Sequence, residues 1–198
     1  MTRWLGIAAL VLLVTSACDG ESGELTPPDE PNGSGAASLP LRSGEVPGGL
    51  EPDPSGTGPI RSIRDVLPPP RRLPNVPPLP DGLRGAFVEG YRRAFAGPEA
   101  TASSTVVRLE DAQAAAEFLA YVRLLPVGGN AATVEELPAT GLGEEGYGWH
   151  LRVPESESSG FAWRAGDTVA TLTFSGPVGR AGPEVSLPLA ERVDGRLA

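Results

Sequence analysis

The sequence has one cysteine, one histidine and no lysine, and each of these shortages excludes a class of site. A single cysteine cannot form an internal disulfide bond. One histidine and one cysteine cannot supply the four ligands of a Cys/His zinc site. The 16 basic residues, all arginine, face 25 acidic residues, and the net charge of −9 argues against nucleic-acid binding. We therefore expect no cofactor, no metal site and no nucleic-acid partner.

The N-terminus combines a short positive region with a short apolar run. Arg3 precedes apolar residues 4–14, a stretch well below the roughly 20 residues of a membrane-spanning helix. This length is typical of the hydrophobic region of a signal peptide. The run leads into Thr-Ser-Ala-Cys, which places the single cysteine of the chain at position 18.

That ending resembles the lipobox of bacterial lipoproteins, although Thr15 stands where leucine is commoner. The resemblance implies a signal peptide over residues 1–17, cleavage after Ala17 and lipid attached to the thiol of Cys18. It also implies that the protein lies at the outer face of the cell membrane, with the membrane as its partner through that lipid. The alternative is an ordinary cleavage site followed by an incidental cysteine.

Residues 18–59 are rich in glycine, proline, serine and acidic residues, and they contain no aromatic residue. Such a segment has few apolar groups to offset the entropy lost on ordering. The sequence therefore predicts a disordered acidic tether over residues 18–59. The tether would lift a domain away from the lipid surface.

Residues 60–84 form a proline-rich arm in which leucine–proline pairs recur every six residues, at Leu67, Leu73 and Leu79. Polyproline II has about three residues per turn, so these leucines would share one edge of an extended arm. One interpretation is a stiff spacer with incidental leucines. The other is an ordered arm that docks on the domain or on a partner.

Residues 85–198 have the length and patterning of one small α+β domain. Helical spacing of apolar residues predicts helices over residues 110–125 and from Ser186 onwards. We expect an antiparallel sheet of about five to six strands with the two helices on one face. The predicted strands are 85–96, 101–110, 131–137, 147–153, 161–165 and 168–174, with a hairpin turn at Gly166-Asp167.

The stretch WRAGDTVATLTFSG, followed by LAERVDGRLA, resembles the end of small actinobacterial lipoproteins and of the extracellular sensor domains of PknH-type kinases. The absence of lysine and the abundance of alanine are typical of a high-GC bacterial genome. The resemblance covers roughly residues 83–198 and implies an extracytoplasmic sensor-like module. The disulfides of those sensor domains have no counterpart here, and no site residues are carried over.

Candidate catalytic groups are sparse. His150 lacks an obvious nucleophile as its partner, and the sequence contains no G-x-S-x-G elbow. The adjacent acids Glu135-Glu136 and Glu144-Glu145 point apart if they lie on strands, but a carboxylate pair formed between loops stays open. Gly141–Gly148 carries two acids and no basic residue, which is unsuited to a phosphate.

Three functions follow from these patterns. The first is a non-enzymatic sensor, adaptor or envelope-interaction module, with a protein or envelope partner. The second is a small carrier that holds an apolar ligand between helix and sheet. The third is a hydrolase that uses loop carboxylates. Adjacent predicted strands carry three aromatic residues, Trp149, Phe161 and Trp163, which either pack in the core or form an aromatic ligand-facing patch.

Overall fold

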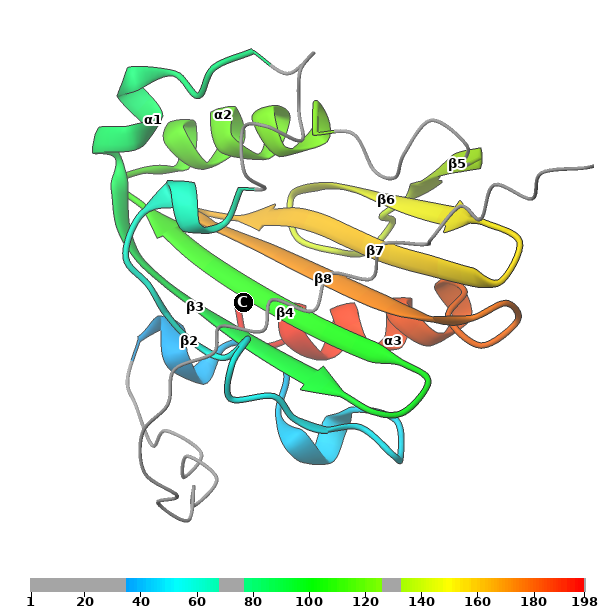
Figure 1. Cartoon of the computed structure of the whole chain (residues 1–198). Helices are drawn as coiled ribbons and strands as arrows, with labels where there is room; N and C mark the ends of the chain where they lie inside the picture. Colours follow the sequence, from blue (N-terminus) through cyan, green and yellow to red (C-terminus); the bar gives the residue numbers. More distant parts are fainter. Residues whose placement is uncertain (1–34, 68–76, 126–132, 198) are drawn as a thin grey trace, which may run out of the picture.

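The structure is a computed structural model, and it describes residues 35–67, 77–125 and 133–197. Ala17 and Cys18 lie outside the described residues, so the signal peptide and the lipid anchor stay predictions. The described part consists of one antiparallel sheet with helices packed against both of its faces (Figure 1).

Eight strands build the sheet within the described residues. They are β1 (Glu51–Pro52), β2 (Gly58–Ile60), β3 (Phe87–Ala96), β4 (Thr101–Leu109), β5 (Thr133–Pro138), β6 (Glu145–Arg152), β7 (Ser156–Ala165) and β8 (Thr168–Pro177). The strand order is β1-β3-β4-β8-β7-β6-β5, and β2 also pairs with β3. The tight turn at Gly166 joins β7 to β8 with Ala165 opposite Thr168, as the hairpin signal predicts.

The helices are α1 (Asp81–Gly85), α2 (Ala112–Arg123) and α3 (Pro183–Asp194), with short 3-10 helices η1 (Ala36–Ser38), η2 (Ser43–Glu45) and η3 (Ile63–Asp65). The Asp111 side chain caps α2 by accepting a hydrogen bond from the Ala114 amide at 2.8 Å. Helix α3 begins at Pro183, one turn before the expected cap at Ser186, because proline suits the first helical position.

The prediction of five to six strands is wrong, although the fold class is still α+β. The two additional strands, β1 and β2, come from residues 51–60, which the sequence places in the tether and at the start of the arm. Both pair with β3, whose outer edge would otherwise present unpaired N–H and C=O groups. Neither segment alternates polar and apolar residues, so its strand pairing comes from β3 and not from local pattern.

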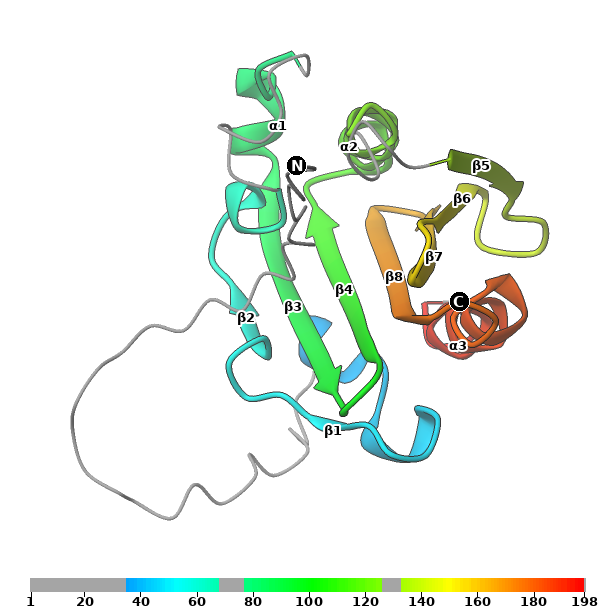
Figure 2. The same ribbon diagram turned by 45° about the vertical axis from the view of Figure 1, so that its right-hand side comes forward.

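The prediction that the helices share one face is also wrong. Helix α3 packs with Phe161, Trp163 and Leu172 on one face of the sheet. Helix α2 packs with Val107, Val169 and other residues on the opposite face. Successive strand residues alternate between the two clusters, so the sheet is the middle layer of three. The turned view separates α2 and α3 on the two sides of β8 (Figure 2).

The predicted tether is part of the folded unit from Gly35 onwards. Leu41 is 0% exposed and belongs to the cluster beneath α3. Arg196 donates hydrogen bonds to the carbonyls of Leu39 and Pro40 and forms an ion pair of 2.6 Å with Glu45. These contacts hold residues 39–45 against the C-terminal helix and correct the expectation of disorder for this segment. Their partners lie more than 150 residues away in the sequence.

The two ends of the proline-rich arm contact the α2 side of the domain. Leu79 is buried in the α2 cluster, and Leu67 packs against the same cluster while staying half-buried. The Tyr121 hydroxyl on α2 donates a 2.9 Å hydrogen bond to the carbonyl of Pro77. Leu73 lies outside the described residues.

Candidate functional site

Helix α2 covers only part of its face of the sheet. It packs over the C-terminal half of β4 and the N-terminal half of β8, where the side chains belong to the apolar cluster. Towards the other end of these strands the same face carries small hydroxyl side chains that are half-buried or exposed. They are Thr101, Ser103, Ser158, Thr171, Thr173 and Ser175. We call this region the hydroxyl face.

Strand register places the hydroxyl groups in rows that run across the sheet. In the first row Thr101 lies opposite Ser175, and Ser175 lies opposite Ser158. The two serine Oγ atoms are 2.8 Å apart, which shows that they point to the same side. In the second row Ser103 lies opposite Thr173. Directly opposite residues in an antiparallel sheet share a face, so the rows form a continuous surface.

A groove of about 590 Å³ lies over the first row at the end of the sheet. The β3–β4 turn at Gly97–Ala100 lines one part of it, and the β6–β7 turn near Glu155 lines another. Thr101, Ser158 and Ser175 also line the groove, and Leu151 and Val153 add apolar surface. Its volume is within the range of small-ligand sites, roughly 300–1,000 Å³.

Two aromatic residues on β6 border the hydroxyl face. Trp149 lies opposite Gly160 of β7, and a Cβ atom at Gly160 would come within 2.3 Å of its indole ring. The indole therefore lies over the backbone of Gly160 on the neighbouring strand. Tyr147 is next to it, with ring centroids 5.9 Å apart. Burial of Tyr147 raises the pKa of its hydroxyl, so this residue stays neutral.

Arg92 on β3 borders the face from the other side. Its Nε donates to Thr105 Oγ1 at 3.2 Å and its Nη2 donates to the carbonyl of Asp65 at 3.1 Å. Burial lowers the pKa of Arg92, partly offset by the charge of Asp65. These contacts direct the guanidinium towards η3 and the hydroxyl of Thr105.

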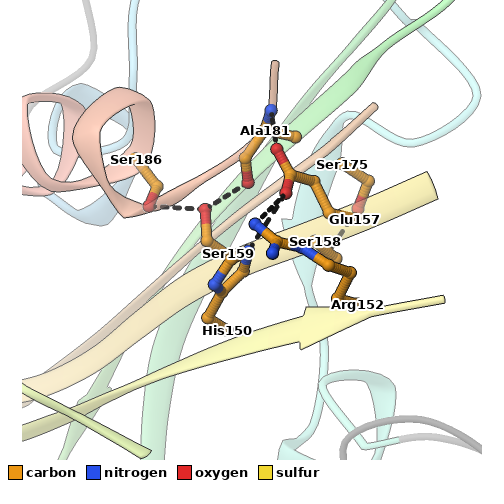
Figure 3. Close-up of polar contacts among 8 residues, drawn as sticks. All are labelled: His150, Arg152, Glu157, Ser158, Ser159, Ser175, Ala181 and Ser186. Carbon is orange, nitrogen blue, oxygen red and sulfur yellow. Dashed lines mark hydrogen bonds and ion pairs between the residues drawn. The ribbon is translucent and has the colours of Figure 1, made fainter. Parts of the chain in front are cut away.

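A second polar cluster lies on the α3 side of the sheet, around the buried carboxylate of Glu157 (Figure 3). The carboxylate accepts a hydrogen bond from the Ala181 amide at 2.8 Å and contacts His150 Nε2 and Arg152 Nη2, each at 3.2 Å. Burial raises the pKa of Glu157, but these hydrogen bonds together outweigh that effect and lower it overall. The cluster fastens the loop between β8 and α3 to the sheet.

Ser159 and His150 are directly opposite in the sheet, but they do not form a nucleophile–base pair. The Ser159 hydroxyl is within hydrogen-bond distance of the Ala181 carbonyl at 2.7 Å and of Ser186 Oγ at 2.8 Å. Both serines are 0% exposed, so a substrate has no access to them. The geometry therefore indicates a structural role: the cluster connects β7 to α3, and His150 contributes to it by contacting Glu157.

In each adjacent pair of acids, one member forms an ion pair with an arginine. Glu144 contacts Arg164 at 2.7 Å, and Glu136 forms an ion pair with Arg123. Glu135 lies opposite His150 and Glu136 opposite Trp149, so this pair points to the two different faces. Within the described ranges, no group of three or more His, Cys, Asp or Glu side chains is arranged to hold a metal ion.

The hollow beside α2, lined by Leu119, Arg123, Tyr147 and neighbouring residues, measures about 130 Å³. This is smaller than the roughly 300 Å³ that a carrier of an apolar ligand between helix and sheet would use. Among the residues that the structure describes, no helix is long and apolar enough to cross a membrane.

The sequence interpretation identified Trp149 as a candidate but missed the hydroxyl face. A signal was present, because Thr171 to Ser175 alternates hydroxyl and apolar residues with the period of a strand. Thr101 to Val106 carries a similar but less regular pattern. Phe161 and Trp163, the other aromatic candidates, are buried on the α3 side.

No protein-family model matches the chain, and no curated protein matches it. The fold is similar to the crystal structure of the extracellular domain of PknH from Mycobacterium tuberculosis, with a TM-score of 0.55 and 13% sequence identity. The similarity covers 82% of this chain and 94% of that one. At this identity the comparison shows a shared fold.

Proposed function

We propose that this chain is an extracytoplasmic, non-enzymatic binding module of a bacterial envelope, held at the membrane by lipid on Cys18. The observation that carries the proposal is the groove of about 590 Å³ at the end of the sheet face that lies beyond α2. The similar fold of an extracellular domain and the lipobox-like N-terminus support an extracytoplasmic location.

The site favours binding over catalysis. Its first row presents the hydroxyls of Thr101, Ser158 and Ser175, and no base is hydrogen-bonded to any of the three in the contacts of the described residues. A serine or threonine nucleophile needs an adjacent general base. Hydroxyl groups that both donate and accept hydrogen bonds are instead suited to recognising a polar ligand.

Photo-cross-linking in intact cells of the native host tests the proposal. A photoreactive phenylalanine analogue would replace Thr101, which is exposed at the groove, and in a control it would replace Glu191, which is exposed on α3. We expect a discrete cross-linked species in the envelope fraction from position 101 and not from position 191. Equal labelling from both positions, or none from position 101, would contradict recognition at the groove.

A further inference from the structure

The first and second rows of the hydroxyl face contain no charged residue on the five strands β3, β4, β8, β7 and β6, whereas the row of Thr171 begins at Arg92 on β3. The first row runs Ala96, Thr101, Ser175, Ser158, Leu151, and the second runs Ala94, Ser103, Thr173, Gly160, Trp149. The chain as a whole carries 41 charged residues among 198, and these ten neighbouring positions carry none. Both rows meet a charged residue only beyond these five strands: Glu51 of β1 lies opposite Ala96 of the first row, and Glu136 of β5, ion-paired with Arg123, lies opposite Trp149 of the second.

Hydroxyl groups and a flat aromatic ring meet on this face. The Cζ2 and Cε2 atoms of the Trp149 indole lie over Gly160, and the side chain packs against the α2 cluster while staying half-buried. From Trp149 the second row continues through Thr173 to Ser103, so ring and hydroxyls lie along one line across the sheet. An aromatic face packs against apolar C–H surface, while hydroxyls exchange hydrogen bonds with polar groups.

We propose that the hydroxyl face binds a neutral oligosaccharide, with one sugar ring stacked on Trp149 and the hydroxyls of neighbouring sugars hydrogen-bonded to the rows. This inference rests on the proposed function and names the ligand class of the groove together with the second row, which lies next to it on the same face. A sugar presents both kinds of surface together: an apolar C–H face and a rim of hydroxyls that donate and accept. A flat set of serine and threonine hydroxyls matches that chemistry without requiring a charge on the ligand.

The surroundings disfavour charged ligands. An anionic ligand would require basic groups within the rows, and Arg92 at their border is bonded to Thr105 and Asp65. The groove is bordered by Glu99 and Glu155, which would repel an anion. Glu99 is paired with Arg180 at 3.0 Å, and this neutralises part of that border. A peptide that extends a sheet would bind at an edge strand and not on the side-chain face.

An array of neutral and acidic oligosaccharides tests the inference, using the chain from residue 18 with Cys18→Ser. Hits would be followed by intrinsic tryptophan fluorescence during titration with the pure oligosaccharide. We expect binding to neutral oligosaccharides of three or more sugars and a fluorescence change on binding. Trp149→Ala should weaken binding by about tenfold or more, and Thr173→Val, which keeps the shape and removes the hydroxyl, by about threefold.

Thr140→Val is the matched control, because Thr140 is exposed in the turn that precedes β6 and lies away from the rows. It should leave the affinity unchanged. If Trp149→Ala does not fold, Thr173→Val still tests the site, because valine is well tolerated in a strand. The inference is overturned if no neutral oligosaccharide binds, if acidic ones bind as tightly, or if a folded Thr173→Val variant binds like the parent. If position 101 cross-links in cells but no oligosaccharide on the array binds, the chain is still a binding module, and its ligand is not a neutral oligosaccharide.

Discussion

His150 Nε2 lies 3.2 Å from Glu157 Oε2, across the β6–β7 hairpin and beneath the loop that leads into α3. The same carboxylate accepts the Ala181 amide, so one buried charge links two strands and a helix connection. The single histidine of the sequence therefore has a structural role, as a partner of the buried Glu157 carboxylate.

Glu157→Gln should destabilise the domain by roughly 2–3 kcal/mol, because it removes charged hydrogen bonds from a buried group. The pKa of Glu157 is lowered from about 4.5, so its charge stabilises the fold fully above that pH and the stabilisation is lost as pH falls below it. Thermal unfolding between pH 3 and pH 7 should therefore show a steeper acid decline for the parent than for the variant. Glu191→Gln, exposed on α3, should behave like the parent.

Arg196→Ala should release the segment around residues 39–45, because Arg196 binds two of its carbonyls and Glu45. We expect a loss on the order of 2 kcal/mol in the free energy of unfolding and faster proteolytic cleavage near Arg42. Arg180→Ala removes an exposed ion pair with Glu99 and should cost less than about 1 kcal/mol. Unchanged cleavage in Arg196→Ala would argue against this role.

Leu79→Gln should destabilise the domain by about 2–4 kcal/mol, because Leu79 is 7% exposed within the α2 cluster. Leu124→Gln provides the comparison, since Leu124 is 57% exposed and its replacement should change stability by about 0.5 kcal/mol at most. Chemical denaturation of both variants measures the difference. Equal midpoints would show that the end of the arm adds nothing to the fold.

Cys18→Ser should move the protein from the membrane fraction to the soluble exported fraction, because a single unlipidated chain lacks the apolar anchor. Intact mass of the parent should reveal the added acyl groups, and metabolic labelling with an alkyne fatty acid should disappear in the variant. Ser16→Ala keeps a small residue before the cysteine and should retain labelling. If the parent is membrane-bound but unlabelled, lipid on Cys18 is not the anchor.

The sequence predicted the elements whose signals are local. Helix α2 follows from apolar spacing and the Asp111 cap, and the β7–β8 hairpin follows from Gly166-Asp167. The start of β7 was missed because Glu157 to Ser159 is polar, and its burial comes from Ala181 and Ser186 beyond the hairpin. A polar run gives no hydrophobic period, so strand and loop are indistinguishable there.

The folded structure of residues 35–60 and the hydroxyl face were both missed, because each depends on contacts between residues far apart in the sequence. Residues 35–60 have the composition of a disordered segment, and their order comes from Arg196, Arg93 and the edge of β3. The hydroxyl face required the register between β4, β8 and β7, which a single sequence does not supply. Hydroxyl residues in strands are common, and only their alignment makes a surface.

The bonds from Arg196 to residues 39–45 also determine how the molecule would bear mechanical load. With the proposed lipid anchor on Cys18 and the proposed ligand on the sheet, a pull between the two would enter the described part of the chain through this segment. The first contacts under tension would therefore be those of η1 and residues 39–45 with Arg93 of β3 and with Arg196 just after α3, and not the long ladders between β4, β8 and β7. Those contacts would yield first and lengthen the connection to the anchor, while the strands that carry the hydroxyl rows stay paired.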